Sequence, residues 1–224
     1  MNKMLPTKTF KLSPSSLNLM KECPRCFWLT EHRVWARPQG IFPSLPSGMD
    51  GILKRHFDKF MERGLLPPEL CNNKECDGFK LFDDKELLSQ WRNSRKGLWY
   101  VDSKGNILHG GVDNILVNKL NNKLIVLDYK TRGFPLKEDT HEHYQNQLNI
   151  YSWLLEALGF STEKFAYLLF YYPKEVLETG EVIFDTVLKK MTIDSKAAER
   201  LWAEALELLN GECPYEHCDW CERF

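Results

Sequence analysis

Apolar residues in the first part of the chain recur at helical spacing after a signal typical of a helix start. Ser13 followed by Pro14 is the pattern of an N-cap with proline at the first helical position. The apolar positions that follow at loosely helical intervals are Leu17, Met20, Phe27 and Leu29. The pattern predicts a helix over residues 13–32.

A second stretch of helical periodicity follows an interruption. Residues 37–48 are rich in proline and glycine, which predicts a loop. The next apolar face consists of Ile52, Leu53, Phe57 and Phe60. Pro67 and Pro68 stop a helix, because proline lacks the amide hydrogen that an inner turn needs. We therefore expect a helix over residues 49–63.

The middle of the chain changes to dense apolar and β-branched runs, which predict strands. Three such runs occupy residues 98–101, 107–117 and 123–131. Turn signals at 103–106 and 121–122 separate them, so we expect a strand meander.

The last third alternates between the two kinds of pattern. It predicts a helix over 141–158, strands over 165–173 and 181–193, and a closing amphipathic helix over 195–210 that Gly211 ends. The resulting order is helices, strands, helix, strands, helix. This order indicates a mixed α/β (α+β) core, with a central mixed β-sheet flanked by helices, rather than a doubly wound parallel sheet.

Length and composition narrow the class of protein. A chain of 224 residues with 43% hydrophobic and 27% charged residues fits one folded domain, which we expect to span residues 1–224. The net charge of −1 predicts weak long-range attraction to nucleic acid, but it leaves room for a local basic groove. We expect a cytoplasmic protein with no membrane partner, because no run is apolar enough to span a bilayer and the start lacks a secretory pattern.

Two carboxylates and a lysine meet at the ends of two predicted strands. Asp128 and Lys130 close the apolar run LIVLDYKT with one residue between them, so both side chains point to the same face and Tyr129 to the other. Asp113 begins the preceding strand, and a hairpin between the strands brings it close to Asp128. Such charged pairs at strand ends are commonly only solvated. The nearly all-apolar strand before them, together with the preceding Gly-Gly-x-Asp strand, favours a functional site instead.

This set of side chains has a definite chemical use. Carboxylates bind Mg²⁺ or Mn²⁺, hard cations that prefer oxygen ligands, and such ions promote attack on a phosphodiester. Lys130 can orient the attacking water or neutralise the phosphorane. The carbonyl oxygen of Tyr129 can complete the metal shell.

Several motifs resemble, in order, those of the RecB-like branch of the PD-(D/E)XK nucleases, which includes the nuclease domains of RecB and AddB and CRISPR-associated exonucleases. They are SPSSLNLMKECPRCFWL at 13–29, GGVD at 110–113, LDYKT at 127–131 and QLNIY at 147–151. His56 occupies the approximate place of the family's upstream metal-binding histidine.

The resemblance implies a restriction-endonuclease-like core and a metal-dependent deoxyribonuclease, expected to be an exonuclease on single strands or DNA ends. It implies metal binding by His56, Asp113 and Asp128, and catalysis by Lys130. It further implies that Gln147 and Tyr151 shape the site or touch the DNA backbone. Partners of such enzymes include helicases and CRISPR or repair proteins.

Cysteines concentrate at the two ends of the chain, in segments 13–32 and 211–224. Two C-x-x-C pairs, Cys23 with Cys26 and Cys218 with Cys221, suit a Zn²⁺ site or a [4Fe–4S] cluster that joins the chain termini. The family resemblance implies a different set for an iron–sulfur cluster, which is Cys23, Cys213, Cys218 and Cys221. The C-terminal spacing here, C-x4-C-x2-C, departs from the family's C-x2-C-x5-C, so both sets stay open. Cys71 and Cys76, in a polar loop, are interpreted as structural or incidental.

Two further hypotheses stand beside the nuclease. The first is a non-catalytic or partner-dependent DNA-binding adaptor that keeps the nuclease fold, and the second is a structural zinc protein. One basic-aromatic cluster is a candidate for nucleic-acid contact, and it consists of Trp91, Arg92, Arg95, Lys96 and Trp99.

Overall fold

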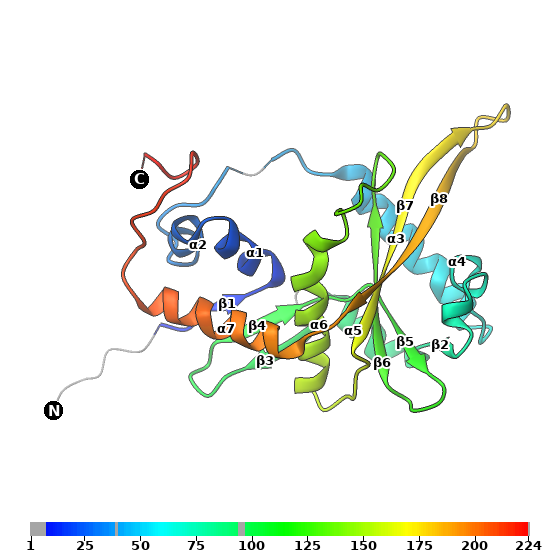
Figure 1. Ribbon diagram of the computed structural model, residues 1–224, viewed down its shortest axis with the longest axis horizontal. Coiled ribbons are helices and arrows are strands. Elements are labelled where there is room, and N and C mark those ends of the chain that lie inside the picture. Colours follow the sequence, from blue (N-terminus) through cyan, green and yellow to red (C-terminus); the bar gives the residue numbers. More distant parts are fainter. Residues whose placement is uncertain (1–7, 39, 94–96, 224) are drawn as a thin grey trace.

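The computed structural model describes residues 8–38, 40–93 and 97–223, and it contains two β-sheets with helices between and around them (Figure 1). The larger sheet has the strand order β2-β5-β6-β7-β8, and the smaller has the order β1-β4-β3. These strands are β1 (Lys11–Leu12), β2 (Phe79–Leu81), β3 (Leu98–Val101), β4 (Ile107–Gly110), β5 (Asn114–Asn118), β6 (Leu124–Thr131), β7 (Phe165–Val176) and β8 (Val182–Thr192).

The larger sheet is mixed, because one of its strand pairs is parallel. β6 and β7 run parallel, while the other neighbours are antiparallel. A parallel pair needs a crossover connection, and helix α6 (Gln145–Ala157) supplies it. Beyond Tyr171, β7 pairs with β8 alone, so the two strands leave the sheet as an arm (Figure 1).

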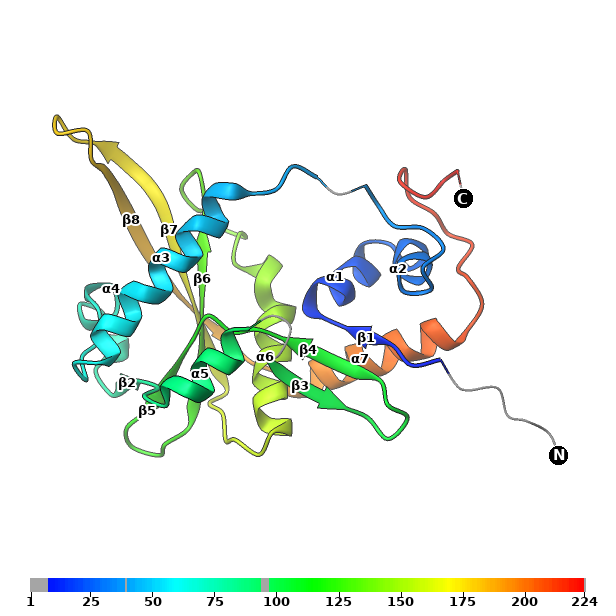
Figure 2. The ribbon, with the colours of Figure 1, turned by 180° about the vertical axis from the view of Figure 1, so that it is seen from behind.

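Helices cover both faces of the larger sheet. α3 (Ser44–Met61) packs on one face, and Figure 2 shows it in front of the sheet, with α6 on the opposite face. Side chains at alternate positions of β6 point to these two faces in turn. Ile125 and Leu127 join the core beneath α3, whereas Leu124 and Val126 join the core beneath α6. Burial on both faces explains why β6 is apolar at successive positions.

The smaller sheet packs on α6, which it shares with the larger sheet, and on α7. Tyr100 of β3 places its ring 4.9 Å from that of Trp153 in α6 and 6.4 Å from that of Trp202 in α7. The remaining elements are α1 (Pro14–Glu22), α2 (Pro24–Glu31), α4 (Pro68–Cys71), η1 (Lys74–Cys76), α5 (Lys85–Arg92), η2 (Glu142–Tyr144) and α7 (Ser195–Asn210).

Two of the predicted elements are each divided into two in the structure. Residues 13–32 form two helices, because Pro24 holds the preceding Cys23 in an extended conformation with φ −159° and ψ 104°. Residues 107–117 form two strands in different sheets, β4 and β5, separated by 111–113. The predicted meander is therefore wrong, since its strands divide between both sheets.

Element boundaries also differ from the predicted ones. The expected loop over 37–48 is shorter, because α3 already begins at Ser44. The helix predicted from residue 141 starts as a 3₁₀ turn and becomes α-helical at Gln145. The pattern missed β1 and β2, which are too short for a periodicity, and it missed α5.

The mixed α/β fold class is confirmed, with a mixed sheet flanked by helices and with the two terminal cysteine segments close together. Within the described residues, no helix is both long and apolar enough to cross a membrane.

Candidate functional site

The β5–β6 hairpin brings the two predicted aspartates together. Asn114 pairs with Leu127, so Asp113 falls beside Asp128 at the end of the hairpin. The backbone N–H of Tyr129 donates to Asp113 Oδ2 over 2.9 Å. Asp128 lies on the α6 side of the sheet with 1% of its surface exposed. The expected proximity of the two carboxylates is thus present.

Lys130 forms the central ion pair of the site. Its ammonium contacts Asp128 Oδ2 directly, which the same-face arrangement of a D-x-K strand allows. The Lys130 Nζ also lies 4.8 Å from the centroid of the Tyr144 ring. The lysine is therefore held between the sheet and the start of α6.

Burial places two negative groups where water screens them poorly. Burial and the neighbouring Asp113 raise the pKa of Asp128 to about 7, against the opposing effect of Lys130. Burial also raises the pKa of Asp113, although Lys54 and Lys130 act to lower it. Two neighbouring carboxylates offer the oxygen ligands that a hard divalent cation prefers. The residues present therefore fit Mg²⁺ or Mn²⁺.

Helix α6 adds a polar pair one turn apart. Gln147 Nε2 lies 2.8 Å from the Tyr151 hydroxyl and 3.4 Å from Asp128 Oδ1. Their i, i+4 spacing puts both on the helix face toward β6. Gly110 permits this approach, since a Cβ at that position would lie 2.5 Å from Tyr151 Cε1.

Two residues of α3 that the sequence reasoning missed also reach the site. Lys54 Nζ lies 3.1 Å from Asp113 Oδ1 and 2.8 Å from Asp50 Oδ2. The i, i+4 spacing of Asp50 and Lys54 is the signal that could have revealed the pair, although such pairs are common on solvated helices.

The structure does not bring His56 to the aspartates. Its Nε2 lies 3.1 Å from Glu69 Oε1, and its ring lies 5.1 Å from that of Phe60. Lys54 and His56 are two residues apart, about 200° around the helix, so α3 presents Lys54 to Asp113 while His56 faces α4. The predicted metal role of His56 has no geometric support among the described residues.

The predicted basic-aromatic cluster is dispersed. Trp91 is 2% exposed and belongs to the core. Arg92 donates from Nε to the carbonyl oxygen of Asp113 over 2.8 Å and from Nη1 to Asp58 over 2.7 Å. Arg95 and Lys96 lie outside the described residues. Of the remaining members, only Trp99 keeps a partly exposed ring.

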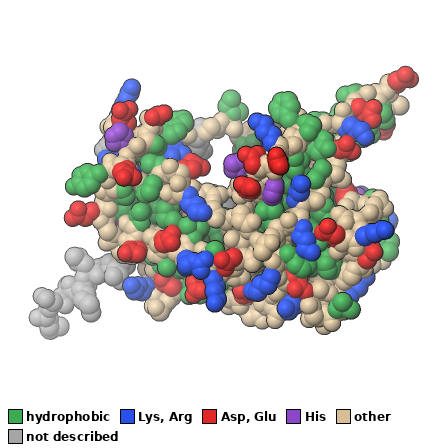
Figure 3. Space-filling model, in the orientation of Figure 1, with side chains coloured by type: hydrophobic (Ala, Val, Ile, Leu, Met, Phe, Trp, Pro, Cys, Tyr) green, Lys and Arg blue, Asp and Glu red, His purple; other side chains and the backbone are tan. Residues whose placement is uncertain are grey.

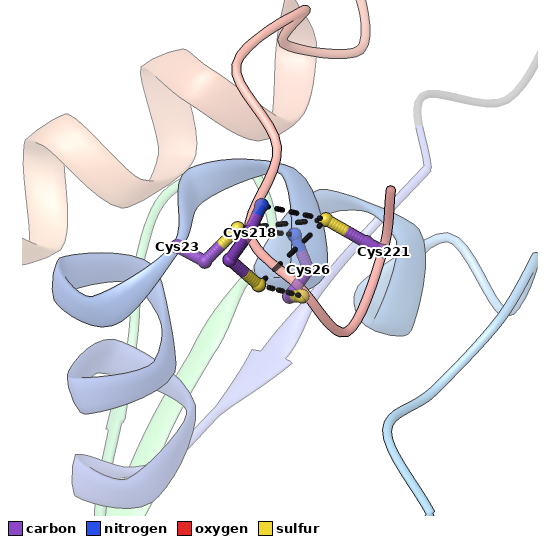
Figure 4. A group of neighbouring side chains, drawn as sticks. All are labelled: Cys23, Cys26, Cys218 and Cys221. Atoms are coloured by element: carbon purple, nitrogen blue, oxygen red, sulfur yellow. Dashed lines mark hydrogen bonds between the residues drawn. The ribbon is translucent and has the colours of Figure 1, made fainter. Parts of the chain in front are cut away.

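Four cysteines from the two ends of the chain form a compact cluster (Figure 4). The sulfur atoms of Cys23, Cys26, Cys218 and Cys221 all lie within 4.8 Å of one another. Pro24 positions the two N-terminal cysteines of the cluster. It breaks the chain between α1 and α2, so that Cys23 lies at the N-cap of α2 and Cys26 in its first turn.

Cys213, a member of the alternative set, lies outside this cluster. Its sulfur lies 3.6 Å from Arg25 Nη1. A second arginine that the sequence reasoning missed, Arg37, lies with Nη2 3.6 Å from Cys218 Sγ. Such cations offset the negative charge that four metal-bound thiolates accumulate.

Comparisons with known proteins identify the family to which the larger sheet and its carboxylates belong. A family model described as the PD-(D/E)XK nuclease superfamily matches residues 79–223. No curated protein matches the chain. Among solved structures, one titled "Crystal structure of SSO0001" is 18% identical over 96% of this chain and 82% of that chain, with a TM-score of 0.40. The family match includes the β5–β6 hairpin and α6, which hold the carboxylates, Lys130 and Gln147.

Proposed function

The chain belongs to the PD-(D/E)XK nuclease superfamily, whose members are in general metal-dependent nucleases, and on this premise we propose that it hydrolyses DNA. The proposal specifies a Mg²⁺- or Mn²⁺-dependent exonuclease of the RecB-like branch that acts on single strands or ends. The principal support is the buried Asp128 in direct contact with Lys130, with the Asp113 carboxylate held beside it by the backbone N–H of Tyr129.

The side chains divide the work as follows. Asp113, Asp128 and the carbonyl oxygen of Tyr129 would hold the metal ion, which supplies a polarised phosphodiester and a more acidic water. Lys130 orients the attacking water and offsets charge on the phosphorane. Gln147 donates from α6 to Asp128 Oδ1 and to the Tyr151 hydroxyl, so these two α6 side chains shape the site.

Lys54 is proposed as a second cation of the site rather than a metal ligand. Its ammonium lies between Asp50 and Asp113, where it restrains the Asp113 carboxylate. The proposed metal role of His56 is weakened, because its imidazole pairs with Glu69.

The cysteine cluster is proposed as a structural metal site that joins the two chain ends, and its spacing supports one Zn²⁺ ion. Four sulfurs at about 2.3 Å from one zinc ion stand about 3.8 Å apart. Three of the separations here are 3.5, 3.7 and 3.9 Å. In a [4Fe–4S] cluster each thiolate binds a different iron, so the sulfurs must stand further apart.

A cleavage assay tests the proposed activity. End-labelled single- and double-stranded DNA is incubated with the protein in Mg²⁺, Mn²⁺ or EDTA, and Lys130→Ala is compared with Lys119→Ala. Lys119 is the control, because it is exposed in the turn before β6. We expect cutting that needs metal, survives in Lys119→Ala and falls by roughly 100-fold or more in Lys130→Ala. Undiminished cutting by Lys130→Ala, with Asp128→Asn also active, would refute the assignment.

An adaptor that works only with a helicase, CRISPR or repair partner remains the alternative function. The net charge of −1 favours it, because the protein lacks general attraction for DNA. Absence of cleavage by folded protein, with its cysteine metal bound, would select this alternative.

A further inference from the structure

A polar pocket lies directly beside the candidate active site. It has a volume of about 470 Å³, within the usual range for ligand sites. Its walls come from the first turn of α1, the end of β4 and the inner face of α6. The lining residues that offer polar side chains are Ser13, Ser15, Asn18, His109, Gln147 and Tyr151. Figure 3 shows the surface hollowed between the region of α1 and α2 and the region of α6.

The pocket connects to the reaction centre through a shared residue. Gln147 lines the pocket and also lies 3.4 Å from Asp128 Oδ1. A group bound in the pocket is therefore a neighbour of the group held by the carboxylates.

The lining chemistry selects the kind of occupant. None of the lining residues is Asp or Glu, although two aspartates lie next to the pocket. Hydroxyl, amide and imidazole groups donate hydrogen bonds to phosphate oxygens. An anion thus meets donors here, whereas a cation meets no carboxylate.

An aromatic surface continues from the pocket along the smaller sheet. His109 in β4 pairs directly with Trp99 in β3, and their ring centroids are 5.9 Å apart. Lys11 Nζ lies 4.3 Å from the centroid of the Trp99 ring. Leu98 and Tyr100 face the core, so the alternation of the strand directs Trp99 to the other face. There Trp99 is partly buried, with the Lys11 ammonium over its ring and the His109 imidazole beside it.

We propose that the pocket and Trp99 form a subsite for an unpaired strand next to the scissile phosphate. A neighbouring phosphate of the strand binds Ser15, Asn18 and His109, and a base stacks on Trp99. Base stacking on aromatic rings is tolerant of sequence but needs an unpaired base. The inference rests on the proposed nuclease function and deepens it, because it assigns single-strand preference to named residues.

Binding without cleavage tests the subsite. The protein carries Lys130→Ala throughout, and the Kd of a fluorescent oligothymidylate is measured by anisotropy in EDTA. Removal of a stacking ring typically costs about 1–3 kcal/mol, so Trp99→Ala should weaken single-strand binding roughly 5-fold or more. Trp220→Ala is the matched control, because its side chain is 55% exposed in the C-terminal segment. Duplex binding should change little in either variant.

A second comparison identifies the direct contact. One abasic nucleotide is moved stepwise along the strand, and one position should weaken binding to the Lys130→Ala protein with Trp99 intact as much as Trp99→Ala does. At that position the two changes together should cost no more than either alone. A neutral methylphosphonate that replaces the phosphate bound in the pocket should likewise weaken binding. This loss of affinity should not increase when Asn18→Ala is added. Additive losses at every position would overturn the subsite, even where Trp99→Ala alone reduces affinity by disturbing the fold.

The outcomes separate the subsite from the nuclease function. Non-additive losses without cleavage by the Lys130-containing protein would leave the subsite and remove the activity. Cleavage by that protein with unchanged single-strand affinity in Trp99→Ala and Trp99→Phe would leave the activity and remove the subsite. Failure of the Lys130→Ala protein to bind any single strand would also overturn the subsite.

Discussion

Gly110 and Tyr151 show how closely the backbone of β4 approaches the helix that serves the site. The Tyr151 ring lies where a Cβ of residue 110 would be, 2.5 Å from its Cε1 atom. The same tyrosine receives the hydrogen bond of Gln147, which lies against Asp128. A single added methyl group would therefore act on the carboxylate through two side chains.

We expect Gly110→Ala to reduce both stability and activity. Overpacking of this kind costs about 1–3 kcal/mol, and displacement of site groups by about 1 Å can reduce a rate roughly 100-fold. Urea denaturation and DNA cleavage measure the two effects. Gly78→Ala is the control, because a Cβ there meets nothing within 4 Å. Equal behaviour of the two variants would contradict the proposed contact.

The raised pKa of Asp128 predicts a pH-dependent stability. Its pKa is about 7 in the folded protein, because of burial and the nearby Asp113, and about 3.9 when unfolded. Between these values the folded state binds more protons than the unfolded state, so stability declines as pH rises toward 7. Replacement by asparagine removes this titration.

Urea denaturation in EDTA at about pH 5 and about pH 8 measures the effect. The free energy of unfolding of Asp128→Asn minus that of the unsubstituted protein should be larger, meaning a relatively more stable variant, at the higher pH. A difference that is constant or moves in the opposite direction would show that the carboxyl has no raised pKa.

At the scale of elements, strand alternation assigns the residues of β6 to two different layers. Tyr129 turns toward α3, with its ring 4.7 Å from that of Phe57, while Asp128 and Lys130 turn toward α6. The sequence predicts this division, because a strand has a side-chain period of two. It does not predict that α3 presents Lys54 to the site, since helix rotation depends on packing of Leu53 and Phe57.

The arm formed by β7 and β8 is an element outside the core. It extends past Tyr171, the last residue of β7 paired with β6, and exposes 66% of Val176 and 52% of Val182. A hairpin supported only by its own strand pair is marginal in water.

Shortening the arm should therefore leave the folded core intact. Replacement of residues 174–183 by Asn-Gly, a two-residue hairpin turn, should change the free energy of unfolding by less than about 1 kcal/mol. Cleavage of DNA should be unchanged. Chemical denaturation and the cleavage assay check this, and a loss of several kcal/mol would mean that the arm supports the sheet.

At the scale of the whole molecule, the cysteine cluster joins segments far apart in the sequence. Cys23 Sγ lies 3.7 Å from Cys221 Sγ across 198 residues. A metal ion that links them restricts the unfolded chain and makes metal binding part of folding.

Metal content distinguishes the two cysteine sets. Cys26→Ser should lose most bound metal and lower the Tm, whereas Cys213→Ser should keep the metal, because Cys213 stands outside the cluster. Elemental analysis of purified protein measures this. One zinc ion per chain in colourless protein is the expected result, and brown protein that contains iron would contradict the single-ion proposal.

The sequence by itself determined the chemistry that depends on local spacing. The D-x-K alternation at Asp128 and Lys130 and the one-turn spacing of Gln147 and Tyr151 follow from the periods of strand and helix. The mixed α/β class followed from the order of such patterns. These features are local, so no knowledge of distant contacts was needed.

Only the tertiary structure decided which distant groups meet. It selected Cys26 over Cys213 for the cluster, placed Lys54 rather than His56 beside Asp113, and buried Trp91 while leaving Trp99 partly exposed. Each outcome depends on the rotation of a helix or the crossing of a strand. Packing between elements determines these rotations and crossings, and a local sequence pattern does not encode them.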